Sequence, residues 1–298
     1  HFRLTNDINL EGKAWTPIGD RLDRQFLGTF DGNDRTVSGL YVSVTTTPRL
    51  YNGLFGVVGK SNQPTTAEVK NLRVEGEVFV ERVFCAGGVA GFVGYGAKIT
   101  DCSFQGTVKT TVDNQATAGY TGGIAGYNFG TISECTVLNS DISGKNQSTT
   151  AGGAVYVAGI VAANNTVGTI SECAVNNSTI TGTNENRTSQ NLVGGIAADN
   201  IVGTIEDCKV INGSVSTFGS MEVSSVGGIA GCSDGTLKGC SNSASVTGNN
   251  AFNLEEKEEV SLGSGGVVGC NYNSVESCSN TGSVTGNGLF TGGVVGYN

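Results

Sequence analysis

Residues 122–135 read GGIAGYNFGTISEC, and variants of this stretch recur along the 298-residue chain. Its Gly-Ile-Ala-Gly segment is called the glycine motif below. Copies of the glycine motif begin at Gly53, Gly88, Gly123, Gly159, Gly195, Gly228, Gly266 and Gly293. Successive copies start 35, 35, 36, 36, 33, 38 and 27 residues apart. Self-similarity at this period is typical of a repeat protein in which each repeat is one supersecondary unit.

Two further patterns follow the glycine motif in each internal repeat. The first, the Ile–Cys motif, places an aliphatic residue three positions before a cysteine. It occurs at Ile99–Cys102, Ile132–Cys135, Ile170–Cys173, Ile205–Cys208, Leu237–Cys240 and Val275–Cys278. The second is a β-branched residue shortly after each cysteine, at Val108, Ile142, Ile180, Val215, Val246 and Val284. With no helical periodicity between them, these patterns predict three short strands per repeat.

Three strands per repeat favour a solenoid in which each repeat makes one coil and its strands pair with the next coil about 4.8 Å away. The predicted fold class is therefore all-β, a right-handed parallel β-helix. A β-propeller has a comparable period, but its blades usually need four strands, and the shortest repeat has only 27 residues.

Composition supports a folded β protein and excludes several classes. There are 47 Gly but only 3 Pro, and 38% of the residues are hydrophobic, which argues against both collagen and disorder. A net charge of -9 disfavours nucleic-acid binding, and no apolar run approaches the ~20 residues that would predict membrane insertion. His1 is the only histidine, so His-based catalytic triads and His-liganded zinc sites are excluded.

The chain divides into two regions by pattern. Residues 1–65 depart from the repeat and contain all three prolines and Trp15, so they are predicted to form an N-terminal cap or first coil. Within them, Asp31-Gly32-Asn33 predicts a turn after a strand at 26–30. Residues 66–298 form the repeat region, which stops inside a repeat. We therefore expect a segment of a larger protein, with flanking domains in the same chain.

Residues 122–128 and 130–135 resemble the GLUG motif of bacterial secreted and surface proteins. Residues 2–10 and 28–33 resemble segments that commonly precede those repeats, so the resemblance covers nearly the whole chain. One copy alone keeps Leu at the second motif position, at Leu54, while Ala162 and Ala198 replace the last Gly. The resemblance implies an exported β-helix, found in adhesin-like proteins and in noncatalytic parts of IgA-specific metallopeptidases. It implies no catalytic residues.

A spacing of three between Ile and Cys breaks the alternation of a strand and predicts a bend between the two residues. The bend positions are Asp101, Glu134, Glu172, Asp207, Gly239 and Ser277. The four carboxylates in this column are candidates for calcium ligands or for an acid/base pair. A solvated turn column is the favoured interpretation, because no basic or aromatic column accompanies them.

Six of the nine cysteines share one repeat position, whereas Cys85, Cys232 and Cys270 lie outside it. Cysteine behaves as a small buried hydrophobe, so the six are predicted to form a reduced ladder inside the solenoid. In-register parallel neighbours present poor side-chain vectors for disulfides. Cys232 and Cys240 are eight residues apart, and so are Cys270 and Cys278. A zinc site with these four thiolates as ligands is the alternative, although the spacing between its ligands is unusual.

The glycine motif is not followed by a helix or a Lys-Ser/Thr pair, so a nucleotide-binding loop is disfavoured and close backbone packing is expected. The connection from the third strand to the next glycine motif varies from 9 to 20 residues and is predicted to emerge along one edge of the solenoid. This edge is the candidate binding face, although the acidic run that it contains is of a kind that usually forms solvated surface. It comprises residues 114–120, 147–156, 184–192, 218–223 and the acidic run 255–259.

Together these patterns predict a structural or adhesive segment of a larger exported bacterial surface protein. Its expected partner is an unidentified host or environmental protein or glycan. We expect no catalysis in this segment, no catalytic, cofactor-binding or metal-ligating residues, and no cofactor. The alternatives are a β-helical polysaccharide lyase or glycosidase and a noncatalytic scaffold of a secreted peptidase. The strand residues, mostly Gly, Ala, Ile, Val, Thr and Ser, disfavour the enzyme.

Overall fold

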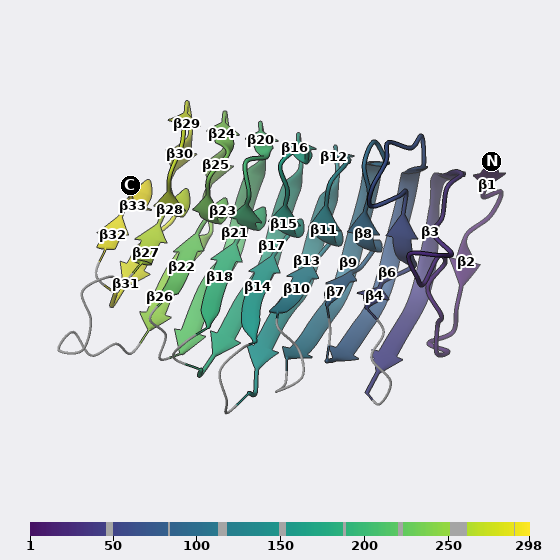
Figure 1. Ribbon diagram of the computed structural model, residues 1–298, viewed down its shortest axis with the longest axis horizontal. Coiled ribbons are helices and arrows are strands. Elements are labelled where there is room, and N and C mark those ends of the chain that lie inside the picture. The colour runs from purple at the N-terminus through teal and green to yellow at the C-terminus, as the bar shows by residue number, and fades with distance from the viewer. Residues whose placement is uncertain are drawn as a thin grey trace.

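The computed structural model describes residues 1–45, 50–82, 84–112, 118–148, 153–186, 189–219, 223–250, 261–288 and 290–298. These residues form strands and turns without a helix, so they provide no membrane-spanning helix. Parallel strands stack one beside another from the purple N-terminal end to the yellow C-terminal end (Figure 1). The predicted all-β parallel β-helix is confirmed.

Three sheets form the faces of the solenoid, called here A, B and C. Sheet C contains β4 (Tyr51–Asn52), β7 (Cys85–Gly87), β10 (Ala118–Gly122), β14 (Ala154–Ala158), β18 (Gln190–Gly194), β22 (Val223–Gly227), β27 (Ser261–Gly265) and β32 (Phe290–Gly292). Sheet B contains β5 (Phe55–Val58), β8 (Ala90–Val93), β11 (Ala125–Asn128), β15 (Val161–Asn164), β19 (Ala197–Asn200), β23 (Ala230–Ser233), β28 (Val268–Asn271) and β33 (Val295–Tyr297).

Sheet A is built from longer strands that divide at a bend in most coils. It begins with β1 (Phe2–Arg3), β2 (Ile8–Asn9), β3 (Thr29–Val44), β6 (Glu68–Glu81) and β9 (Lys98–Val112). It continues with β12 (Thr131–Ser133), β13 (Thr136–Asn146), β16 (Thr169–Ser171), β17 (Ala174–Asn184), β20 (Thr204–Glu206) and β21 (Lys209–Gly219). It ends with β24 (Thr236–Lys238), β25 (Ser241–Asn242), β26 (Ser245–Asn250), β29 (Val275–Glu276), β30 (Ser279–Asn280) and β31 (Val284–Gly286).

Each coil follows the chain through sheets A, C and B in turn. One coil comprises β12 and β13, then β14, then β15, and the next begins at β16. Equivalent residues pair in register between coils: Ile132 lies opposite Ile170, and Val137 opposite Val175. The repeat spacing therefore sets which side chains stack in one column.

The sequence motifs that form the three strands of each coil differ from those that we predicted. The Ile–Cys motif and the β-branched position after it both lie in sheet A, as Ile132 and Ile142 do. The glycine motif forms the corner between sheets C and B, since β10 ends at Gly122 and β11 begins at Ala125. Sheet C lies within the connection that we expected to be loop, and its strands were missed because their residues differ from coil to coil.

Aliphatic columns fill the interior of the solenoid, which we call the lumen. Ile99, Ile132, Ile170 and Ile205 form one such column, and all four are completely buried. Burial of an aliphatic side chain of this size contributes about 1.5–3 kcal/mol. The column recurs in every internal coil, so it is a principal source of stability along the whole solenoid.

Glycine at the corner allows sheets B and C to approach each other closely. A Cβ at Gly122 would lie 2.0 Å from the carbonyl oxygen of Ala125. A Cβ at Gly126 would lie 2.8 Å from the backbone nitrogen of Ala86, on a sheet C strand. Real Cβ atoms do not approach so closely, so the predicted packing role of these glycines is confirmed.

The first 28 residues cover the N-terminal end through a few short pairings. β1 and β2 pair with the long strand β3, and isolated bridges join Ile18 to Phe55 and Phe26 to Val58. The ring centroids of Phe26 and Phe55 are 5.2 Å apart. The turn predicted at Asp31-Gly32-Asn33 is wrong, because β3 continues through it with a register shift between Asp31 and Arg35. Positive φ at Asn33 absorbs the bend without ending the strand.

Candidate functional site

Residues predicted at the bend between Ile and Cys adopt the left-handed backbone conformation. The φ angles are 49° at Asp101, 56° at Glu134, 53° at Glu172 and 54° at Asp207. Gly239 and Ser277 share this geometry, and Asn71 occupies the same position one coil before Asp101. The carboxylates are exposed. This column is therefore a row of solvated bends, as the favoured interpretation expected.

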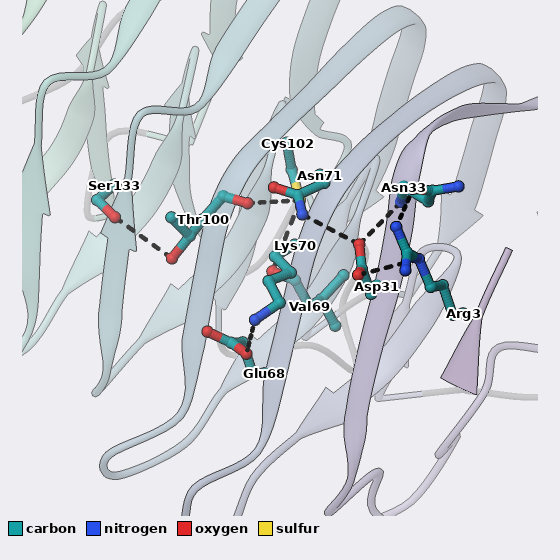
Figure 2. A network of polar contacts seen from close by, with 10 residues as sticks. All are labelled: Arg3, Asp31, Asn33, Glu68, Val69, Lys70, Asn71, Thr100, Cys102 and Ser133. Carbon is teal, nitrogen blue, oxygen red and sulfur yellow. Dashed lines mark hydrogen bonds and ion pairs between the residues drawn. The ribbon is translucent and has the colours of Figure 1, made fainter. Parts of the chain in front are cut away.

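At the N-terminal end the bend column joins a network of polar contacts (Figure 2). Asp31 accepts hydrogen bonds from the Asn71 side-chain amide at 3.0 Å and from the backbone N–H of Asn33 at 2.9 Å. Its other oxygen lies 3.6 Å from Nε of Arg3. The bonds from Asn71 and Asn33 and the charge of Arg3 lower the pKa of Asp31. The network ties β1 to β3 and β6.

A shallow hollow of about 70 Å³ lies over the bend column, lined in part by Asp34, Asn71, Asp101 and Glu134. Ligand pockets usually measure about 300–1,000 Å³, so this one is too small to enclose a sugar. No group of three or more Cys, Asp, Glu or His side chains that could hold a metal ion occurs in the part of the chain that the structure describes. The calcium and acid/base interpretations of the column therefore gain no support from its geometry.

A larger hollow of about 410 Å³ lies near the N-terminal end. Its lining consists of Leu27, Lys60, Pro64, Thr65 and Thr66. A glycosidase site requires two carboxyl groups flanking the bond to be cleaved, and these five residues provide none.

The predicted cysteine ladder lies in the lumen. Cys102, Cys135, Cys173, Cys208 and Cys240 are free and buried, and Cys278 is free and partly buried. Cys135 illustrates the bonding, since its Sγ lies 3.2 Å from the Ser133 carbonyl oxygen and its N–H donates to Sγ of Cys173 at 3.4 Å. Burial raises the pKa of the Cys135 and Cys173 thiols well above the ordinary value. These thiols are packing groups rather than nucleophiles.

The alternative of a four-thiolate zinc site is wrong. Cys240 packs in the lumen, whereas Cys232 packs in a separate apolar cluster outside it. Cys270 pairs in register with Cys232, and its Sγ lies 2.9 Å from Oγ of Ser225 in sheet C. Cys240 and Cys278 thus lie in the lumen, whereas Cys232 and Cys270 lie on the outer side of sheet B, so the four thiols do not converge.

An asparagine ladder at the corner between sheets B and A was missed in the sequence. The side-chain amide of Asn128 donates to Oδ1 of Asn164 at 2.8 Å, and Asn164 donates to Asn200 at 2.9 Å. Asn200 continues the ladder to Oγ of Ser233. The sequence does contain a pattern for this ladder. An Asn or Ser stands two residues after the end of the glycine motif in successive repeats, as in Gly126-Tyr127-Asn128.

A second apolar region, which we call the inter-sheet cluster, lies between the outer faces of sheets B and C. Tyr120 and Tyr156 stack in neighbouring sheet C strands with ring centroids 4.8 Å apart. Tyr127, on sheet B, meets Tyr120 edge to face at 5.0 Å. Phe92 lies one coil before Tyr127, with a centroid distance of 6.0 Å. Aromatic residues therefore close the angle between the two sheets over several coils.

Asp199 occupies the Tyr127 column two coils later, next to Cys232. Desolvation, reinforced by the nearby charge of Asp234, raises the pKa of Asp199 to about 7. Burial in the same cluster, with Asp199 contributing negative potential, also raises the pKa of Cys232. Asp199 is thus the most strongly perturbed carboxyl among the described residues, and the repeat pattern contained no sign of it.

The candidate binding edge can be placed only in part. Residues 113–117, 149–152, 187–188, 220–222 and 251–260, including the acidic run 255–259, lie outside the described residues. Of the remainder, residues 118–120, 154–156 and 190–192 belong to sheet C strands. These residues therefore form strands and not the loops that the sequence predicted.

Comparison with known proteins identifies the repeat. The family model described as "The GLUG motif" matches residues 83–109, which include β7, β8 and most of β9. No match was found among curated proteins.

Two solved structures have a similar fold. One is a "putative immunoglobulin A1 protease from Bacteroides ovatus", with 18% identity, a TM-score of 0.51, and coverage of 98% of this chain and 77% of that one. The other is an "IgA1 Protease", with 16% identity, a TM-score of 0.51, and coverage of 98% of this chain and 22% of that one. At these identities the likeness concerns the fold. The motif match and the in-register coils agree with the resemblance found in the sequence: this chain is a parallel β-helix that contains a match to the GLUG motif.

Proposed function

We propose that this chain is a noncatalytic structural segment of a larger exported bacterial surface protein, and that it binds a host or environmental protein or glycan. One observation carries the proposal: the carboxylate, cysteine and asparagine columns that repeat from coil to coil all serve the packing and folding of the solenoid. Bend carboxylates occupy left-handed turns, cysteines fill the lumen, and asparagines bond from coil to coil. A stack of this kind serves as a spacer and as a support for loops.

Similarity to immunoglobulin A1 protease structures supports export of the whole protein and a scaffold role beside a peptidase. A shared fold does not carry catalytic function with it, because activity resides in sites placed on the fold. The larger hollow lacks the paired carboxylates of a glycosidase, and the hollow beside Asp101 and Glu134 is too small to enclose a sugar. Binding without turnover is therefore the function we favour over a polysaccharide lyase or glycosidase.

The test is an array screen of host proteins and glycans with the purified chain, run in parallel with assays for immunoglobulin A1 cleavage and polysaccharide degradation. We expect saturable binding to at least one array component and no product in either assay. Product formation by the chain would overturn the noncatalytic assignment. Failure to bind any component at micromolar concentration would contradict the adhesive role and leave a purely structural spacer.

A second experiment asks whether the variable edge carries recognition. Shortening the connection 249–262 to the length of the connection 286–291 is expected to weaken binding to the component found in the screen. The bend column supplies the matched control, since Glu134→Thr and Glu172→Ser change exposed turns elsewhere on the coil. Loss of binding in these controls with full binding by the shortened chain would place the functional face at the bends instead.

A further inference from the structure

We propose that the larger hollow, which we call the Lys60 hollow, is a binding site for a hexuronate, a sugar ring that carries one carboxylate. It measures about 410 Å³, within the usual range of ligand pockets, and is lined by Leu27, Lys60, Pro64, Thr65 and Thr66. Four of these residues belong to one connection, which runs from β5 in sheet B to β6 in sheet A. The inference rests on the proposed function, of which it names one ligand class.

The connection that builds the Lys60 hollow is specific to one coil. It comprises residues 59–67, whereas the other connections from sheet B to sheet A contain two to four residues in the part of the chain that the structure describes. Those coils close with the short connections, so the additional residues are not needed to close a coil. Extra length at a single corner of a regular scaffold is the usual way in which a binding loop is added to it.

The base of this connection is bonded to the first coil on either side of Leu27. The backbone N–H of Gly59 donates to the carbonyl of Phe26 at 2.8 Å. The N–H of Glu68, directly after the connection, donates to the carbonyl of Gly28 at 3.0 Å. Leu27 therefore lies between the two attachment points, and its side chain contributes apolar surface to the hollow.

The middle of the connection is bonded to the following coil. The N–H of Tyr95 donates to the carbonyl of Lys60 at 2.9 Å, and the N–H of Thr65 donates to the carbonyl of Tyr95 at 2.8 Å. The hydroxyl of Thr65 donates to the same carbonyl at 3.2 Å. A connection held at its base and at its middle is already ordered before a ligand arrives, which lowers the entropic cost of binding.

Charge selects the ligand. Lys60 is the single charged residue in the lining, and its ammonium group forms no ion pair among the described residues. Lys70, on β6, is by contrast paired with Glu68 at 2.7 Å. The chain carries a net charge of -9, so the molecule as a whole repels ligands with several negative charges. A single unpaired cation in such a molecule fits a ligand with one negative charge.

The other lining residues match the rest of a hexuronate ring. The hydroxyl of Thr66 can donate to a ring hydroxyl, and that of Thr65, which donates to the backbone, can accept from one. Leu27 and Pro64 offer apolar surface to the C–H face of the ring. Lys60 then donates a charge-assisted hydrogen bond to the carboxylate. A neutral sugar leaves the ammonium unused, and a simple anion leaves the apolar residues unused.

The experiment titrates the full 298-residue chain with glucuronate and galacturonate and follows its backbone amides by NMR. Saturable shifts are expected at residues 59–67, with a dissociation constant of ~1 mM, as for a weak single-sugar site. Glucose has the ring without the carboxylate, and acetate has the carboxylate without the ring. Both are expected to bind at least ~10-fold more weakly than the uronates.

Variants at the cation test its role. Lys60→Gln is expected to weaken uronate binding at least ~10-fold, whereas Lys60→Arg keeps the charge and is expected to retain binding. Lys209→Gln changes an exposed lysine on β21 and is the matched control, expected to bind like the unmodified chain. Thermal melts of all three variants verify that they fold.

The absence of saturable shifts up to ~50 mM of either uronate would overturn the inference. So would equal binding of glucose or acetate, or equal weakening by Lys60→Gln and the control. The array screen distinguishes this failure from failure of the proposed function. A chain that binds an array component but neither uronate keeps the proposed function and refutes this site, whereas a chain that binds neither contradicts both.

Discussion

The lumen and the inter-sheet cluster are both apolar interiors, yet they are built by different rules. In the lumen the same residue type returns in each coil, as the column of Ile99, Ile132 and Ile170 shows. In the inter-sheet cluster a single column changes from Tyr120 and Tyr156 to residues as small as Ser225. The isoleucine column of the lumen stays aliphatic from coil to coil, whereas the angle between the two sheet faces accepts a tyrosine and a serine at one position.

The largest effect is expected from Ile170→Asp, which places a charge in the lumen where no partner can reach it. An unpaired buried charge costs several kcal/mol, so the free energy of unfolding is expected to fall by about 4 kcal/mol or more. Denaturant unfolding followed by circular dichroism measures the change. Thr169→Asp, on the outward face of the same strand, is the control and should differ by less than about 0.5 kcal/mol. Equal melting of the two variants would contradict the lumen assignment.

Thiol labelling compares the two interiors directly. Cys102, Cys135, Cys173 and Cys208 are buried in the lumen, while Cys232 is partly exposed beside the inter-sheet cluster. Labelling of lumen thiols requires a coil to open, so they are expected to react at least ~100-fold more slowly than Cys232. Mass spectrometry of timed alkylation under native conditions gives the rates. Rapid modification of the lumen thiols, or their recovery as bonded pairs, would refute the ladder.

Tyr120→Ala tests the inter-sheet cluster itself. The ring stacks on Tyr156 and meets Phe84 and Tyr127, so its removal is expected to destabilise the protein by about 2–3 kcal/mol. The control is Tyr272→Ala, because that side chain is 54% exposed. Comparable urea midpoints for both variants would mean that the cluster stabilises the protein no more than an exposed side chain does, and that it is not a second core.

Asp199→Asn is expected to give the smallest change, and one that depends on pH. The carboxyl has a folded-state pKa of about 7 against an ordinary value of 3.8, so its ionisation opposes folding. Stability of the unmodified chain is therefore expected to fall as the pH rises from about 4 to 7 and then to level off. Above pH 7 the variant should be more stable by about 1–2 kcal/mol, with the advantage vanishing below pH ~4. Melting curves across this range measure the effect, with Glu172→Gln at an exposed bend as the control. A constant difference at all pH values would contradict the desolvation of Asp199.

The contrast between the lumen and the inter-sheet cluster also decides how much of the structure the sequence predicts. The β-helix, the cysteine ladder and the bends at Glu134 and Glu172 were predicted because equivalent positions stack from coil to coil and keep similar residues. Sheet C was missed because Tyr156, Leu192 and Ser225 share a column without sharing a chemistry. Neighbours from other coils set the pKa of Asp199, so no local pattern reveals it.

The arrangement of hydrogen bonds in the three sheets has a mechanical consequence. Strands run across the solenoid, so the bonds between coils point along its long axis. A pull between the two ends therefore loads each rung in tension rather than in shear, and the rungs detach successively from an end. Each detached coil of about 35 residues releases roughly 120 Å of slack. Under tension the chain is expected to behave as an extensible tether that yields in repeated small steps and protects whatever is attached to it from sudden load.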